Sequence, residues 1–180
     1  YSYPYTSDAA KQKVIELAKM VGDYANGITL HIVKFTEIQE AIHEHCPEEY
    51  MITLMRRFMM RIADRLSQNK EYGCLVTGES LAQVASQTIE SMTVIGEAIK
   101  SNIPLLKPLV GFDKEETISI SKKIGSYDIS IRPYDDCCTV FLPKYPAIKP
   151  NLERVIRAES KLDIEGLIEE AFKNVEKYVF

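Results

Sequence analysis

Short apolar runs that alternate with longer amphipathic segments most constrain the fold of this chain. The β-branched run at 28–33, the apolar run at 73–77 and the proline-flanked run at 104–110 are each expected to be extended. Strands that alternate with helices form βαβ units, and such units build parallel sheets. The sequence therefore predicts an α/β fold with a mostly parallel sheet flanked by helices.

Helix periodicity and helix-end signals occupy the segments around these runs. Ser7 and Asp113 are suitable N-caps, and Gly125 is a suitable left-handed stop. Thr36 and Gln39 fit a capping box. Helices are expected from Ser7 to the turn at 25–27, from Thr36 to about Pro47, and over 49–69, 81–92, 113–124, 151–160 and 163–177. A short extended segment is expected at 129–132, and a long loop at 133–150.

The carboxyl ends of the predicted strands are where a ligand is expected. Parallel sheets bind ligands in the crevice outside those ends. The turns after Val33, Thr77 and Val110 follow the three predicted strands. If the strands are parallel, all three turns lie on one edge of the sheet.

Composition limits the class of protein. The chain has 180 residues and a net charge of −4, which suits one domain and gives no overall attraction to nucleic acid. Any RNA contact must then come from a local patch or from another domain. No segment approaches the roughly 18 uninterrupted apolar residues of a membrane-spanning helix, so no membrane protein is expected. Because the sequence starts at Tyr1 rather than at a methionine, we expect a fragment or a processed product.

The four cysteines predict reduced thiols rather than a disulfide scaffold. They are Cys46, Cys74, Cys137 and Cys138. Adjacent Cα atoms lie about 3.8 Å apart, below the usual disulfide range. Cys74 is expected in the core, and the cytoplasm is the expected compartment.

A polar segment after the second run is the first candidate site. It reads Thr-Gly-Glu-Ser-Leu-Ala-Gln-Val-Ala-Ser-Gln-Thr over 77–88. Gly78 would allow a ligand to approach the backbone, and a helix start would favour anionic groups. Gln83, Ser86, Gln87 and Thr88 would line the helix that follows. An ordinary capped, solvent-facing helix is an equally good interpretation of the pattern alone.

Cys137 and Cys138 in the proline-rich loop are the second candidate. A reactive thiolate needs nearby cations or a helix N-terminus. Asp135 and Asp136 work against this, whereas Arg132, Lys144 and Lys149 would compensate. Two small buried hydrophobic residues are the alternative, but an irregular loop favours function.

Several cations and histidines complete the candidates. One helix face carries Arg57, Arg61 and Arg65, which is typical of a solvated stripe paired with acids such as Asp64. Arg56 lies off that stripe and would reach a phosphate or a base. Lys114 in a first helical turn is either a tolerated surface charge or a cation that reaches into a ligand cleft. His43 and His45 diverge on a helix, so no metal site is expected.

Taken together, the segments 54–61, 77–88, 108–114, 124–125 and 132–138 resemble the ThiI family of tRNA 4-thiouridine synthetases. The stretch Gly-Glu-Ser-Leu-X-Gln-Val-Ala-Ser-Gln-Thr is long enough to be specific. The resemblance implies that 1–180 is the C-terminal portion of an adenine nucleotide α-hydrolase-like (PP-loop) domain, truncated at its N-terminal side. The PP-loop, the THUMP domain and the ferredoxin-like region would lie outside this chain, so the isolated piece is expected to be inactive.

The resemblance also implies an activity and site residues. The enzyme would adenylate a tRNA uridine with ATP and Mg²⁺, and a persulfide sulfur from a cysteine desulfurase would then displace AMP. Arg56, Gly78 and Gln87 fall on ATP-binding positions, and Lys114 on a lysine implicated in activation. Counting from Lys114 puts the sulfur-handling cysteine at Cys137, whereas counting from Arg132 puts it at Cys138. Sulfur transfer for thiamine synthesis is implied as well.

Two rival functions remain at this level. Another PP-loop adenylating enzyme would use the same nucleotide site without the thiols. Alternatively, the fragment would be a non-catalytic module that holds a homodimer or docks the desulfurase, since a truncated sheet exposes strand edges.

Overall fold

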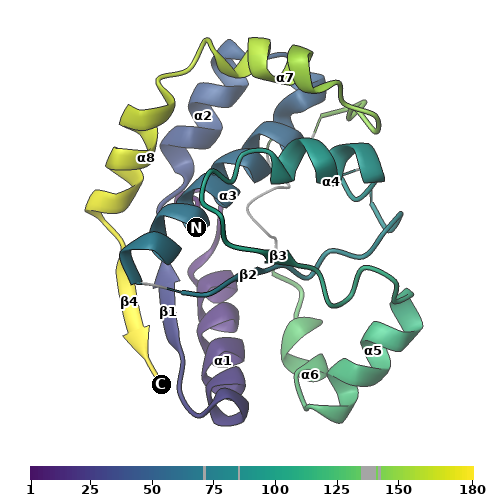
Figure 1. The fold of residues 1–180 in the computed structure, drawn as a ribbon. Helices are drawn as coiled ribbons and strands as arrows, with labels where there is room; N and C mark the ends of the chain where they lie inside the picture. The colour runs from purple at the N-terminus through teal and green to yellow at the C-terminus, as the bar shows by residue number, and fades with distance from the viewer. Residues whose placement is uncertain (71, 85, 135–140, 142) are drawn as a thin grey trace.

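The structure is a computed structural model that describes residues 1–70, 72–84, 86–134, 141 and 143–180. Figure 1 shows the chain as a ribbon. In order, the elements are α1 (Asp8–Ala25), β1 (Thr29–Ile32), α2 (Thr36–His45), the 3₁₀ turn η1 (Glu48–Tyr50), α3 (Met51–Lys70), β2 (Leu75–Val76), α4 (Ile89–Gly96), β3 (Leu105–Leu106), α5 (Lys114–Lys123), α6 (Tyr127–Ser130), α7 (Leu152–Glu159), α8 (Ile164–Lys173) and β4 (Glu176–Val179).

The hydrophobic core is built around α3. Leu54 and Phe58 on this helix are completely buried, and Met51 and Met55 are nearly so, as expected for packing methionines. In Figure 1, α2, α7 and α8 lie on one side of α3 and α4 on the other. α3 packs against all four of these helices, and this packing holds α3 and the side chains on it in place.

The strands form two small sheets. β2 and β3 are parallel, with Leu75 opposite Leu105, whereas β1 and β4 are antiparallel, with Leu30 opposite Tyr178. The predicted α/β class is confirmed, but instead of one mostly parallel sheet the described residues form one parallel and one antiparallel pair. Only the turns after Thr77 and Val110 therefore share an edge of a parallel sheet. The turn after Val33 belongs to the other sheet.

Local signals predicted some element ends and missed others. Ser7 and Asp113 are N-caps, Asp113 with a full capping box, and Gly125 has the expected positive φ of 81°. The predicted capping box at Thr36 is wrong, because its hydroxyl donates to the Tyr3 carbonyl instead and Phe35 is the N-cap.

Three segments differ from the prediction. The predicted helix over 81–92 is wrong for 81–88, because helix α4 begins only at Ile89. Residues 129–132, expected to be extended, overlap the short helix α6. The end of the predicted helix over 163–177 is instead β4, which pairs with β1.

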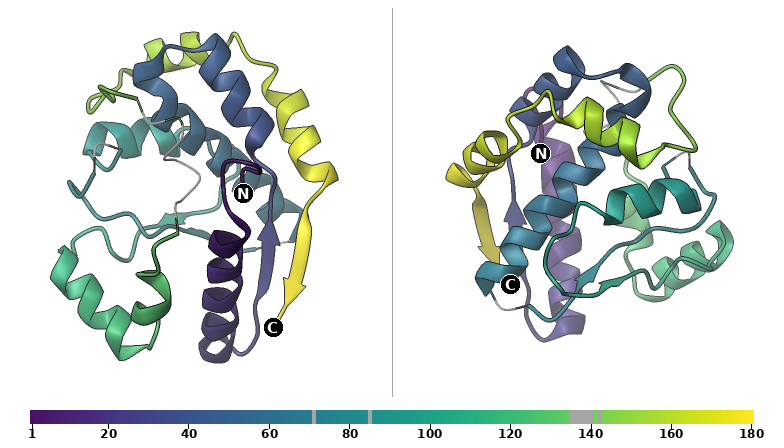
Figure 2. Two further views of the ribbon diagram at one scale, coloured as in Figure 1. Left: turned by 180° about the vertical axis from the view of Figure 1, so that it is seen from behind. Right: turned by 45° about the horizontal axis from the view of Figure 1, so that its top comes forward.

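Helices α5 and α6 form a unit that packs on α1. The Tyr24 hydroxyl donates to the Ile124 carbonyl at 3.2 Å, and Arg132 pairs with Glu16 at 2.6 Å. Seen from behind, the unit lies on one side of α1 and strands β1 and β4 on the other (Figure 2). Of the helices described, none is both long and apolar enough to span a bilayer.

Candidate functional site

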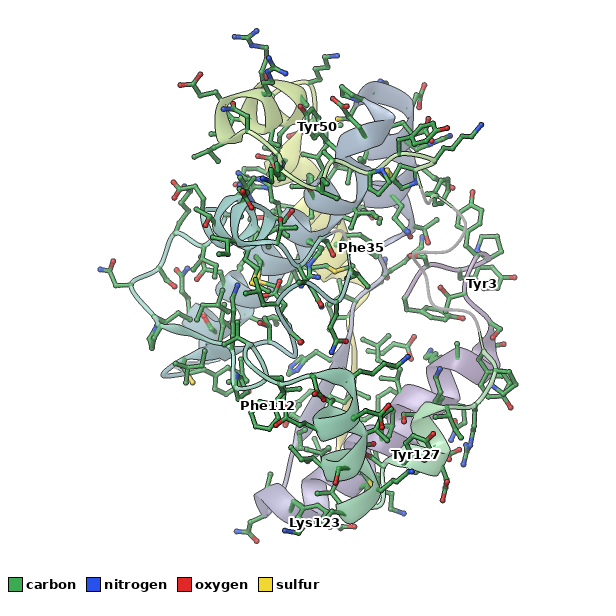
Figure 3. The ribbon with its side chains drawn as sticks, turned by 90° about the vertical axis from the view of Figure 1, so that its right-hand side faces the viewer. Tyr3, Phe35, Tyr50, Phe112, Lys123 and Tyr127 are labelled. Atoms are coloured by element: carbon green, nitrogen blue, oxygen red, sulfur yellow. The ribbon has the colours of Figure 1, made fainter. Side chains whose placement is uncertain are left out.

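The loops that follow β2 and β3 are joined into one surface. The Leu81 N–H donates to the Val110 carbonyl at 3.0 Å, and the Ser80 hydroxyl donates to the Phe112 carbonyl at 2.7 Å. Figure 3 shows Phe112 where the loop from β3 enters α5. Two of the three predicted strand ends therefore meet, as parallel pairing requires.

A buried carboxylate organises this surface. Glu79 Oε1 accepts from Arg56 at 2.6 Å, and Glu79 Oε2 accepts from Lys107 at 2.7 Å and from the Thr77 hydroxyl at 3.0 Å. The Glu79 side chain is 3% exposed, whereas Arg56 and Lys107 are 21% and 17% exposed. The cations therefore lie between the carboxylate and solvent.

Sequence analysis missed Glu79 and Lys107 as site residues. The available signal was an acidic residue shortly after one predicted strand and a lysine within the next, and only the structure shows that the two are in contact. Arg56 was predicted to leave the arginine stripe toward a ligand, and the structure does place it at the strand ends.

The polar residues after Gly78 belong to a loop rather than to a helix. The Ala82 N–H donates to the Gln87 carbonyl at 2.8 Å, and the Gln87 N–H donates to the Val84 carbonyl at 2.9 Å. Arg56 also donates to the Ser86 hydroxyl at 3.3 Å, which brings Gln87 next to the Arg56–Glu79 pair. Gln87 Oε1 is buried and has no hydrogen-bond partner among the described residues.

Gly78 and Lys114 border open space. A Cβ added at Gly78 would meet no atom within 4 Å, so a group can approach this backbone. A cavity of about 560 Å³ lies between Leu81, Ala82 and Gln83 on one loop and 110–114 on the other. Lys114 is exposed at its rim, so it shares this surface with the Gly78 loop.

Cys137 and Cys138 lie outside the described residues. The described segments before and after them are anchored. Lys13 donates to the Tyr134 carbonyl at 3.4 Å, and Phe141 packs edge-on against Tyr5 at 4.9 Å. Further on, the Thr88 hydroxyl donates to the Ile148 carbonyl at 2.6 Å, which fastens the end of this loop beside Gln87.

The other two cysteines are half-buried thiols. The Cys46 thiol lies 3.4 Å from the Ala158 carbonyl. Burial raises the pKa of Cys46, which favours the unreactive thiol. Cys74, predicted to be a core residue, is only half-buried and directly precedes β2.

The arginine stripe pairs with acids, but not with the predicted one. Arg57 and Arg61 both bind Glu159, and Arg65 binds Glu169. Asp64 accepts instead from the backbone N–H groups of Lys100 and Ser101 and from the Ser101 hydroxyl. The stripe is therefore structural rather than part of the site.

The described part of the chain holds a further cavity but no cluster of metal ligands. A mostly apolar cavity of about 520 Å³ lies between α1, β1 and α3, away from the strand-end residues. Within the described ranges, no three histidine, cysteine, aspartate or glutamate side chains are grouped to hold a metal ion.

Comparisons with known proteins agree on one family. A family model described as "Thiamine biosynthesis protein (ThiI)" matches residues 1–164. The chain is 51% identical over 169 residues to a probable tRNA sulfurtransferase of Caldanaerobacter subterraneus subsp. tengcongensis, covering 94% of this chain and 44% of that protein. It is 52% identical over 176 residues to one of Acetivibrio thermocellus, covering 98% and 44%.

A solved structure agrees with the sequence relatives. The crystal structure of a 4-thiouridine synthetase–RNA complex with bound ATP matches with a TM-score of 0.90 and 36% identity, over all of this chain and 47% of that one. The chain thus spans less than half the length of the relatives that it matches.

Proposed function

The chain belongs to the ThiI family, and from that premise we propose that residues 1–180 are the C-terminal portion of the adenine nucleotide α-hydrolase-like domain of an ATP-dependent tRNA uridine 4-sulfurtransferase. The PP-loop, THUMP and ferredoxin-like regions would be supplied by other parts of a longer protein. The observation that carries the proposal is the group formed by Arg56, Gly78 and Gln87 at the ends of β2 and β3.

These residues suit a nucleotide. Gly78 leaves its backbone open to a close approach. The unpaired Gln87 Oε1 can accept from an amine of a base or a hydroxyl of a ribose, which removes the cost of an unsatisfied buried acceptor. Arg56, with its fork of N–H donors, can bind a phosphate while it holds Glu79. Support for ATP also comes from the solved relative, which contains it.

The proposed reaction has two steps. In the first, the uridine O4 attacks the α-phosphate of ATP, pyrophosphate leaves, and Lys114 offsets negative charge that grows on the phosphate. In the second, the outer sulfur of a persulfide on Cys137 or Cys138 attacks the activated carbon, and AMP leaves. A second thiolate then attacks the inner cysteine sulfur and breaks the S–S bond, which releases 4-thiouridine and leaves a disulfide that a thiol reductant would reduce. Mg²⁺ would arrive with the phosphates, since the described residues offer no carboxylate cluster to hold it.

The partners follow from this reaction. The solved relative is an RNA complex, which supports tRNA as the substrate. Because this chain has a net charge of −4, we assign most of the RNA contact to other parts of the protein. A cytoplasmic cysteine desulfurase would supply the sulfur, and the family name supports a second role in thiamine synthesis.

Nucleotide binding by the full-length protein tests the first step. We expect Gln87→Ala to weaken ATP binding, because it removes the acceptor, and Gly78→Val to block it, because a branched side chain fills the approach space. Isothermal titration would measure both. Gln12→Ala, which removes an exposed glutamine on α1, is the matched control and should bind normally. Unchanged affinity in both variants would refute the assigned site.

Sulfur transfer tests the second step. The double variant Cys137→Ser/Cys138→Ser is expected to lose 4-thiouridine formation while it still binds ATP. The two single variants identify which thiol handles the sulfur. A double variant that thiolates tRNA at the normal rate would favour another PP-loop adenylating enzyme. A protein that self-associates in light scattering but gives no ATP signal would favour the docking module.

A further inference from the structure

The Glu79 cluster, formed by Arg56, Glu79 and Lys107, has more positive than negative charge. One carboxylate binds two cations, so the group of Arg56, Glu79 and Lys107 has a net charge of +1. An ammonium has three N–H donors and a guanidinium five, and the bonds to Glu79 use only one of each. Both cations therefore keep donors for a further anion on their more exposed side.

A second cluster in the same molecule shows what a purely structural version looks like. Glu159 also binds two cations, Arg57 and Arg61. Arg57, however, is 2% exposed, and its remaining nitrogen donates to the Val94 carbonyl inside the core. The Glu79 cluster differs in its place, because it lies at the carboxyl ends of two parallel strands, beside open Gly78 backbone and the unpaired Gln87 oxygen.

We propose that Glu79 is a positioning residue that holds Arg56 and Lys107 as a paired anchor for the phosphates of the nucleotide, with Lys107 as a second phosphate-binding cation. This inference rests on the proposed function of the same site. Glu79 does not touch the ligand. It fixes two flexible side chains, one on a helix and one after a strand, so that little conformational entropy is lost when the phosphates bind.

The cluster predicts how the binding energy of ATP is divided between its phosphates and its nucleoside. Phosphates would contact Arg56 and Lys107, whereas the base and ribose would contact the Gln87 side. Loss of Glu79 should therefore weaken ligands with phosphates and leave adenosine unaffected. Simple repulsion between Glu79 and the phosphates would have the opposite effect, because removing the carboxylate would then tighten ATP binding.

Titration of the full-length protein with ATP and with adenosine tests the proposal. We expect Glu79→Gln and Lys107→Met each to weaken ATP about tenfold, the usual cost of one charge-assisted contact, and to change adenosine affinity less than about twofold. The double variant should be little weaker than either single variant, since both changes disable the same anchor. Glu159→Gln is the matched control, because it disrupts the structural cluster and should leave the ratio of the two affinities unchanged.

Each other outcome has a defined meaning. Tighter ATP binding by Glu79→Gln, an equal loss of ATP and adenosine, or additive effects in the double variant would overturn the positioning role. Should Glu79→Gln fail to fold, Lys107→Met decides alone, and a normal ATP affinity in that variant overturns the paired anchor. No ATP binding by the unmodified protein would overturn the proposed function and this inference with it.

Discussion

At the scale of single residues, Arg57 and Glu159 show how the core tolerates charge. Both side chains are almost fully enclosed, and Arg61 adds a second cation on the same carboxylate. Burial alone would raise the pKa of Glu159, but hydrogen bonds and charge from Arg61 and Arg57 hold it below its usual value. The carboxylate is therefore ionised and paired in the folded protein.

Removal of this carboxylate should be costly. Glu159→Gln leaves Arg57 buried without its counter-charge, and breaking such a pair costs about 3–5 kcal/mol. Urea denaturation would measure the loss of unfolding free energy. The control is Glu169→Gln, which removes the more exposed partner of Arg65 and should cost about 1 kcal/mol or less. Equal losses in the two variants would contradict the buried pairing.

The same group predicts an acid dependence. A carboxyl group with a pKa lower in the folded than in the unfolded state stabilises the fold above its unfolded pKa. That stability is lost as the pH falls below about 4.3, the usual glutamate value, and through the lower folded pKa. Denaturation between pH 7 and pH 3 should show a smaller acid loss in Glu159→Gln than in the unmodified chain. A parallel decline would mean that other carboxylates dominate.

Helix periodicity allowed the position of Arg56 off the arginine stripe to be predicted, but not its contact with Glu79. Arg56 stands apart from the stripe of Arg57, Arg61 and Arg65 because of helix periodicity, which is a local property. The contact of Glu79 with Lys107 spans two strand ends and depends on the parallel register of β2 and β3. No spacing within the sequence encodes that distance.

At the scale of elements, the segment 77–88 shows why a helix prediction failed. Its residues are compatible with a helix, but Ala82 has a positive φ of 62°, and Ala82 and Gln87 close a turn. Thr88 then caps α4 by accepting from the Ser91 N–H at 3.1 Å. A second contact, from the Thr88 hydroxyl to the Ile148 carbonyl, is tertiary and could not be read from the sequence.

The Thr88 hydroxyl should therefore stabilise the fold through both its cap of α4 and its bond to Ile148. Thr88→Ala is expected to cost about 1–2 kcal/mol, because loss of an N-cap alone typically costs about 1 kcal/mol. Thr88→Ser keeps the hydroxyl and should cost little. Amide hydrogen exchange of Ser91 and Met92, whose N–H groups donate to Thr88, would report the local loss. If Thr88→Ala leaves the protection of these amides unchanged, the Thr88 hydroxyl does not hold the first turn of α4 in place.

Helix α5 illustrates the opposite case, in which local signals suffice. Asp113 and Glu116 close a capping box, and Gly125 ends the helix. Both ends are set by residues close in sequence, so the prediction of 113–124 matches α5 closely.

At the scale of the whole molecule, the sheets depend on pairs far apart in sequence. The predicted helix over 163–177 ran into the start of β4, yet Glu176–Val179 pairs with β1, and Lys11 binds Glu176 at 2.5 Å. Tyr178 and Val179 favour extended backbone, but a strand also needs a partner, and that partner lies near the start of the chain. The class of fold could be predicted from alternation, whereas the division into two sheets could not.

Deletion of residues 175–180 tests this pairing. The change leaves the backbone of β1 without its described antiparallel partner, so we expect a loss of a few kcal/mol in unfolding free energy, from about four ladder positions. Hydrogen exchange should show the amides of residues 28–32 becoming labile, while those of α3 remain protected. Persistent protection of residues 28–32 would show that β4 does not hold the first strand.

The packing of α5 and α6 on α1 has a consequence for mutational surveys. Lys114 begins α5, and the far end of the same unit is fastened to α1 through Tyr24 and Glu16. Under the role proposed for Lys114, substitutions that loosen these anchors would shift the lysine away from the phosphates without contacting the lysine itself. A screen of the full-length protein for slow 4-thiouridine formation should consequently return changes in α1, although Tyr24 and Glu16 are not among the residues of the proposed site, and their defect should appear in turnover more than in affinity.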